Sequence, residues 1–369
     1  MYRKLILVLL ITAFLAGCWD QQDITKRTIV LCLGLDRVAD GRTKVSLQIP
    51  IGEQQPTISG TTVEAKPFIL LSAEGKSAFA AIPALQSKTQ RDLFFGQIKT
   101  VIINADLARR GSRGMVDFLR RHPTIPPQAF FLLTEQEASK ILSYPLVTKQ
   151  IPMYFTVGFF QSQGKKDWAF SQRVWEFDRN IDSQTQDAYI PLIDYNHREK
   201  IFVIKGLGVF HDSKLVGKLS GMETRMFGLL SGLAKNGYLS NPIPKYGRIT
   251  FRKVTAKPKV KVAYYQKQFY FKISVKVHAY LVEATAGEIS LTPREQKQIQ
   301  TITAHYLNRE MKKTIRHLQE LNSDILALGE KLRATHPKEW AATDWDQEYP
   351  KAKISVSVKF MITRTGTKL

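Results

Sequence analysis

The sequence predicts an α+β protein of three domains, in which mixed and antiparallel sheets are covered by packed helices. Residues 269–282 alternate between apolar and polar side chains, which is typical of a strand with one exposed face. Residues 99–104 (KTVIIN) form a second strand-like run and are followed by short helical segments. Thr292, with a proline next to it and Glu295 three residues on, marks the start of a long helix.

The first half of the chain contains short elements separated by turn residues. Residues 28–36 and 44–51 surround an Ala-Asp-Gly turn signal and predict a β-hairpin. Thr134 and Glu137 have the spacing of a capping box and predict a helix that runs to residue 144. The other expected elements are strands at 67–72, 99–104 and 129–133 and helices at 74–86, 106–110, 115–122 and 171–181.

The second half begins after a polar stretch near residue 190, where we place a domain boundary. Residues 201–211 and 214–219 predict a hairpin, and Ser220 with Glu223 predicts a capped helix through residue 233. Further strands are expected at 248–257, 259–265, 269–282 and 354–362. We expect the long helix to stop or kink at Gly329. One side of this helix, which shifts gradually around the helix axis, is expected to carry Ile299, Ile302, Tyr306, Arg309, Lys313, Ile315, Leu318, Asn322 and Ile325.

The beginning of the chain has the layout of a bacterial lipoprotein signal. Arg3 and Lys4 precede an apolar run at 5–15, which is shorter than the roughly 20 residues that a membrane-spanning helix needs. The run ends in Leu-Ala-Gly-Cys, a sequence that directs acylation of a cysteine sulfur and cleavage before it. We therefore expect Cys18 to be the lipid-attachment site, on the outer face of the cytoplasmic membrane. An ordinary signal peptide is the alternative.

These patterns divide the chain into five parts. The expected parts are a signal peptide at 1–17, a lipid-anchored spacer at 18–26, an N-terminal α+β domain at 27–190, a middle domain with a hairpin and a helix at 200–255, and a C-terminal α+β domain at 256–369.

Composition narrows the class of protein. The net charge of +22 favours contact with anionic surfaces such as lipid headgroups or wall polymers, and nucleic acid is not an expected partner outside the cytoplasm. Cys32, left without a partner once Cys18 carries lipid, is interpreted as a small buried hydrophobe. The histidines lack ligand spacing, and no CxxC, GxSxG or GxGxxG motif occurs in a suitable context. We therefore expect no catalytic residue, metal or cofactor, and interpret the chain as a non-enzymatic interaction protein.

Five segments in the same order resemble the Ger(x)C family of spore germination proteins. The resemblance covers nearly all of the expected mature chain. The matching residues are 17–20 (GCWD) with 30–36 (VLCLGLD), 94–103 (FFGQIKTVII), 206–210 (GLGVF) with 214–217 (KLVG), 223–225 (ETR), and 323–330 with 337–340, 345 and 356–362. Gln97 stands where relatives often carry histidine.

The resemblance implies the lipoprotein C subunit of a nutrient germinant receptor, without catalytic activity, on the spore inner membrane. It also implies two integral-membrane partners, an A-type and a B-type subunit, which are required with it for nutrient-triggered germination. Nutrient recognition is attributed to those partners, so this chain is not expected to bind the nutrient. The alternative is a lipid-anchored solute-binding or wall-polymer-binding protein, although the long antiparallel segments argue against two α/β solute-binding lobes.

Four residues besides Cys18 are candidate partner contacts: Asp36, Glu223, Arg225 and Trp340. Asp36 could instead be a turn residue at a strand end, and Glu223 could be the acid of a capping box. Trp340 could instead pack in the core. Asp324, which we do not count among the contacts, is expected to satisfy a helix end or to pair with a cation.

Overall fold

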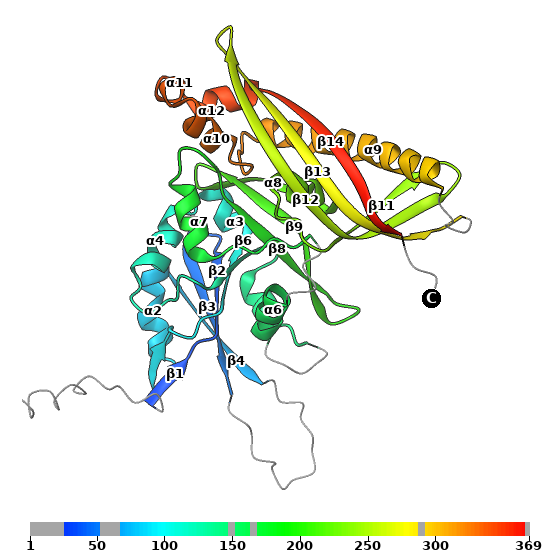
Figure 1. Cartoon of the computed structure of the whole chain (residues 1–369). Helices are drawn as coiled ribbons and strands as arrows, with labels where there is room; N and C mark the ends of the chain where they lie inside the picture. Colours follow the sequence, from blue (N-terminus) through cyan, green and yellow to red (C-terminus); the bar gives the residue numbers. More distant parts are fainter. Residues whose placement is uncertain (1–25, 52–66, 147–151, 163–167, 287–291, 366–369) are drawn as a thin grey trace, which may run out of the picture.

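The computed structural model describes residues 26–51, 67–146, 152–162, 168–286 and 292–365. These residues form an eight-stranded sheet, a four-stranded sheet and a small two-stranded sheet, with helices packed on the two larger sheets (Figure 1). The expected α+β class, with mixed sheets and packed helices, is therefore confirmed. The expected signal peptide and Cys18 lie outside the described residues.

The eight-stranded sheet has parallel strands at its centre and antiparallel hairpins at both ends. The hairpin expected at 28–51 is confirmed as the antiparallel pair β2–β3. The strand order is β10-β9-β8-β7-β6-β2-β3-β4, with β2 (Cys32–Arg37), β3 (Thr43–Pro50), β4 (Phe68–Gly75), β6 (Thr100–Asn104), β7 (Phe130–Thr134), β8 (Tyr189–Asn196), β9 (Ile201–His211) and β10 (Lys214–Leu219). A separate two-stranded sheet pairs β1 (Arg27–Ile29) with β5 (Asp92–Phe94).

Helices cover both faces of this sheet, because the central strands β6 and β7 are buried at every residue and need apolar cover on each side. One face packs against α2 (Ala78–Gln86), α3 (Ala105–Arg110), α4 (Arg113–Arg121) and α7 (Val174–Ile181). The other packs against α5 (Ala138–Ser143) and α6 (Pro152–Gln161). No helix was predicted where α6 lies. Pro83 lies within α2 and does not end it.

The capping box expected at Thr134 and Glu137 is wrong. Glu137 precedes α5 but makes no capping hydrogen bond with its side chain. The carboxylate of Asp36, at the end of β2, accepts hydrogen bonds from the backbone N–H groups of Ala138 at 2.5 Å and Ser139 at 2.9 Å. Asp36 is 2% exposed, and burial raises its pKa although both N–H groups act in the opposite direction. A residue about a hundred positions away thus caps α5 and fixes it to β2.

The strands expected on the two sides of residue 190 belong to one sheet. β8 pairs antiparallel with β9 along its whole length, and β9 pairs with β10. The expected middle domain at 200–255 therefore begins with strands that continue the N-terminal sheet. The division into three domains stays a prediction.

The four-stranded sheet is built on one very long hairpin. Its order is β11-β12-β13-β14, with β11 (Gly237–Ile243), β12 (Gly247–Tyr265), β13 (Gln268–Ala284) and β14 (Lys353–Thr365). The strands expected at 248–257 and 259–265 are a single strand, since Pro258 lies within β12 opposite Val275. β14 runs parallel to β13, so this sheet is mixed rather than purely antiparallel.

Two capped helices cover the inner face of this sheet. The capping boxes expected at Ser220/Glu223 and Thr292/Glu295 are confirmed, and they begin α8 (Gly221–Ser231) and α9 (Pro293–Glu320). The side of the helix predicted from the spacing is not buried throughout, since Arg309 and Lys313 are largely exposed, and the helix ends before residue 322. The buried residues of α9 are Ile299, Thr303, Leu307, Met311, Thr314, Ile315 and Leu318.

Amide side chains of α9 cover the open edge of β14, along which α9 lies in Figure 1. Gln296 donates to the carbonyl of Ile362 at 3.3 Å, and Gln300 accepts from its N–H at 3.0 Å. Asn308 donates to the carbonyl of Val356 at 2.6 Å. These three amides recur at multiples of four residues, which places them on one side of the helix.

Four short helical elements lie between α9 and β14: α10 (Leu328–Thr335), α11 (Pro337–Ala341), α12 (Trp345–Glu348) and the 3₁₀ turn η2 (Tyr349–Lys351). Gly329 is neither a stop nor a kink of the long helix, because it lies in the first turn of α10. Among the described residues, no helix combines the length and the apolar character needed to cross a bilayer.

We expect Asp36→Asn to lower the free energy of unfolding by about 1–2 kcal/mol, because an amide can accept only one of the two N–H hydrogen bonds at the start of α5. Urea denaturation of the full mature chain measures this. Asp92→Asn, at an exposed position, is the matched control and should change stability by less than about 0.5 kcal/mol. Equal stability of the two variants would contradict the capping role.

Candidate functional site

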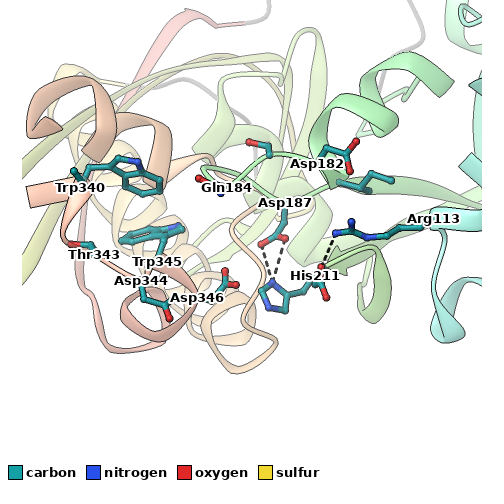
Figure 2. Close-up of a pocket in the computed structure, with 14 residues that line it drawn as sticks. Arg113, Asp182, Gln184, Asp187, His211, Trp340, Thr343, Asp344, Trp345 and Asp346 are labelled. Atoms are coloured by element: carbon teal, nitrogen blue, oxygen red, sulfur yellow. Dashed lines mark hydrogen bonds and ion pairs between the residues drawn. The ribbon is translucent and has the colours of Figure 1, made fainter. Parts of the chain in front are cut away.

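A cleft of about 550 Å³ lies where the edge of the eight-stranded sheet meets the C-terminal helices. The start of α4, the segment after α7 and the β9–β10 turn line one side, and residues of α11 and α12 line the other (Figure 2). Asp212 and Ser213 form the β9–β10 turn with φ values of +43° and +65°, as a two-residue hairpin turn of this twist requires. This turn places His211, the last residue of β9, inside the cleft.

Asp187 and His211 form the polar centre of the cleft and point toward each other in Figure 2. The His211 Nδ1 atom lies 3.3 Å from Oδ1 of Asp187. Hydrogen bonding to Asp187 raises the pKa of His211, and partial burial opposes this effect. The other ring nitrogen of His211 lies 3.4 Å from the amide nitrogen of Asn322. The imidazole is thus held between the sheet and the loop that follows α9.

Asp324 connects this pair to the C-terminal helices. Its carboxylate accepts hydrogen bonds from the N–H groups of Leu328 at 3.0 Å and Gly329 at 2.8 Å, and from Nε1 of Trp345 at 3.1 Å. The expectation that Asp324 satisfies a helix end is therefore confirmed. Asp324 is 1% exposed, and burial raises its pKa to about 7 against the opposing effect of the N–H donors.

Two hydrogen bonds, each donated by a backbone N–H group, join the two aspartates directly. The N–H of Asp324 donates to the carboxylate of Asp187 at 2.8 Å, and the N–H of Asp187 donates to the carbonyl of Asp324 at 3.1 Å. We call Asp187, His211, Asp324 and Trp345 the junction network. It ties the end of β9 and the segment just before β8 to the helices that follow α9.

The chemistry of the cleft is that of a polar joint. Among the described residues, no group of three or more histidine, cysteine, aspartate or glutamate side chains has a geometry that could hold a metal ion. The two hydroxyl side chains that line the cleft have other partners than His211: Ser183 bonds to Thr185, and Thr343 donates to the carbonyl of Glu339. Arg113 pairs with Asp212 at the rim at 3.1 Å. Among the described residues that line the cleft, neither hydroxyl is hydrogen-bonded to a histidine or carboxylate that could act as its base.

The structure does not bring the sequence-predicted site residues together. Cys18 lies outside the described residues. Asp36 is buried in its capping role, which leaves it no surface for a partner. Glu223 serves its capping box and also accepts from His317 Nδ1 at 2.7 Å, which joins α8 to α9. Arg225 is half-buried, with its guanidinium 5.9 Å from the centre of the Trp168 ring. Trp340 is half-buried and lines the cleft.

Sequence reasoning missed Asp187 and His211. Asp187 closes a polar stretch that predicted only a boundary, and His211 had no second histidine at ligand spacing to mark it. The available signal was position: His211 lies at the end of a predicted strand next to a two-residue turn. Asp324 lies more than a hundred residues further along the chain, so no local pattern could predict that it contacts Asp187.

We expect the junction network to make stability depend on pH in a defined direction. The pKa of Asp324 in the folded chain, about 7, is above its ordinary value of about 3.9, so the folded state retains a proton that the unfolded state has lost. Across this window the free energy of unfolding should fall as pH rises, by up to about 1.4 kcal/mol per pH unit. The raised pKa of His211 acts in the same direction at higher pH.

Asp324→Asn should remove the effect of Asp324, because an amide does not titrate. The free energy of unfolding of the variant, relative to that of the unmodified chain, should therefore rise between pH 4 and 7. Urea denaturation at several pH values measures this. Asp344→Asn, an exposed residue of the same cleft, should follow the unmodified chain. If the variant instead loses stability relative to the unmodified chain as pH rises, the three N–H donors hold the carboxylate ionised, and the prediction is wrong.

Two family models match the chain in order. The spore germination protein N-terminal domain matches residues 20–195, and the C-terminal domain described as spore germination B3/GerAC like matches residues 205–366. The point between the two matches falls at the β8–β9 turn, within the eight-stranded sheet.

Curated relatives and a solved structure agree with these matches. The chain is 21% identical to spore germination protein GerQC of Bacillus cereus, over 99% of each chain. It is 22% identical to spore germination protein KC of Bacillus subtilis, over 98% of this chain and 95% of that protein. The crystal structure of the GerBC protein has the same fold, with a TM-score of 0.55 and 17% identity over 90% of this chain and 96% of that one. The chain belongs to the GerAC-like family of spore germination proteins, the Ger(x)C family that its motifs resemble.

Proposed function

We propose that this chain acts in spore germination as the lipid-anchored, non-enzymatic C subunit of a nutrient germinant receptor. The observation that carries the proposal is that both halves match models of spore germination proteins, in order and over nearly the whole chain. Two relatives that match over almost their full length are themselves named spore germination proteins. The cleft supports the non-enzymatic part, because its polar groups are used to join elements.

The anchor is assigned to Cys18. The support for it is the cationic start, the short apolar run and the Leu-Ala-Gly-Cys sequence that ends it. Acylation at this position would attach the mature chain to the outer face of the spore inner membrane. Stable attachment takes two acyl chains, since one alone binds a bilayer marginally. The proposed partners are an A-type and a B-type integral-membrane subunit in the same membrane.

The test is nutrient-triggered release of dipicolinate from spores of a strain without related receptors. Three versions are compared: deletion of the gene for this chain, the substitution Cys18→Ala and the substitution Cys32→Ala. We expect the deletion to abolish the response to at least one nutrient among amino acids and sugars. Cys18→Ala should weaken the same response and shift the chain from the membrane fraction to the soluble fraction.

Cys32→Ala is the matched control, because it removes the same atoms from a buried position within β2. It should leave both the response and the membrane fraction unchanged. A deletion strain that responds normally to every nutrient would refute the receptor role. Loss of response in the deletion, with Cys18→Ala still membrane-bound and active, would retain the receptor role and refute the anchor.

A further inference from the structure

The outer face of the four-stranded sheet carries an array of lysines. Side chains of a strand alternate between its two faces, and the apolar side chains of β12, β13 and β14 face α8 and α9. The opposite face carries seven exposed lysines, here called the lysine face: Lys257, Lys259, Lys261, Lys272, Lys276, Lys353 and Lys359.

The register brings like charges directly opposite one another. Lys257 pairs with Lys276, and Lys276 pairs with Lys359, so three lysines form one row across three strands. Lys261 pairs with Lys272 in a second row. Neighbouring strands lie about 4.8 Å apart, and lysines two residues apart on one strand are separated by about 6.7 Å. The lysine face is therefore a regular grid of positive charge.

Nothing in the described structure neutralises this grid. None of the seven lysines forms an ion pair with another described residue. The three strands contain a single acidic residue, Glu283, which lies near the end of β13 opposite Thr250. Like charges directly opposite in a sheet disfavour folding. A bound anion would offset the repulsion among the lysines of these three strands. We therefore infer that the lysine face has an external anionic ligand.

We propose that the lysine face binds a linear, phosphate-bearing polyanion. The described clefts do not include any of its lysines, so it offers an extended surface rather than a pocket for one small anion. Between the lysine rows, Ser274 accepts a hydrogen bond from Ser357 at 3.1 Å and retains its own O–H to donate to a phosphate oxygen. Lysine binds phosphate as a point charge and tolerates a flexible polymer.

Two other occupants fit the lysine face less well. Protein interfaces are depleted in lysine and enriched in aromatic residues at their centre, whereas the central rows here carry lysine and serine. A bilayer presents a flat plane of charge, whereas β12–β14 are long and strongly twisted (Figure 1). A flexible polymer can follow a twisted row of charges. The exposed tyrosines Tyr264 and Tyr265 lie at the hairpin tip, and Tyr270 lies close to it, directly opposite Lys353 at the end of the lysine face.

The test is binding of long-chain inorganic polyphosphate to the full mature chain in non-ionic detergent, measured by calorimetry at several salt concentrations. The variant Lys257→Gln/Lys276→Gln/Lys359→Gln removes the row of three lysines. We expect it to raise the dissociation constant about tenfold or more and to weaken the salt dependence, because fewer counterions are displaced. Its melting temperature should be unchanged or higher, since the repulsion in the row is removed.

The control variant is Lys312→Gln/Lys331→Gln/Lys338→Gln, which removes the same charge from exposed positions on α9, α10 and α11. It should bind polyphosphate nearly as well as the unmodified chain. Equal losses in the two variants would mean that only net charge matters, and would overturn the proposal. Vesicles of anionic phospholipid that bind through the row of three while polyphosphate does not would overturn it in favour of a membrane surface.

Discussion

The buried carboxylate of Asp324 is the constraint on which the joint between the two sheets depends. Three N–H groups point at one side chain, and two of them come from the start of α10. Moving α10 away from the sheet would leave these donors without an acceptor inside the protein, at a cost of about 1–3 kcal/mol for each buried group. The same loop is held to the segment just before β8 by two hydrogen bonds with Asp187, one to its carboxylate and one from its backbone N–H. These contacts fix the position of α10 relative to the eight-stranded sheet.

This joint explains how a chain matched by two family models forms one connected structure. The N-terminal model ends at residue 195 and the C-terminal model begins at residue 205, yet the strands on both sides of this point are hydrogen-bonded neighbours. The sheet that begins in one half is completed by the other, and its edge then meets α10 to α12. Glu223 and His317 add a second link, within the C-terminal half, between α8 and α9. Neither half buries its apolar surface alone.

Local patterns in the sequence predicted the elements whose causes are local. The capping boxes at Ser220 and Thr292 and the hairpins at 28–51 and 201–219 depend on residues within a few positions of each other, and they were confirmed. The start of α5 was misread because its cap, Asp36, comes from a different strand. The pairing of Asp187 with His211 and Asp324 was missed for the same reason. The side of α9 predicted from residue spacing differs from the side that is buried, because a helix packed on a twisted sheet buries small polar residues such as Thr303 as well as large apolar ones.

The glutamine and asparagine side chains along α9 have a consequence for assembly. An edge strand with free N–H and C=O groups can recruit a strand from another molecule, and β14 is 13 residues long. Gln296, Gln300 and Asn308 occupy some of these groups from the side, so a foreign strand would have to displace the helix before it could pair. The β14 edge of the C-terminal sheet is thus protected against pairing with a strand of another molecule.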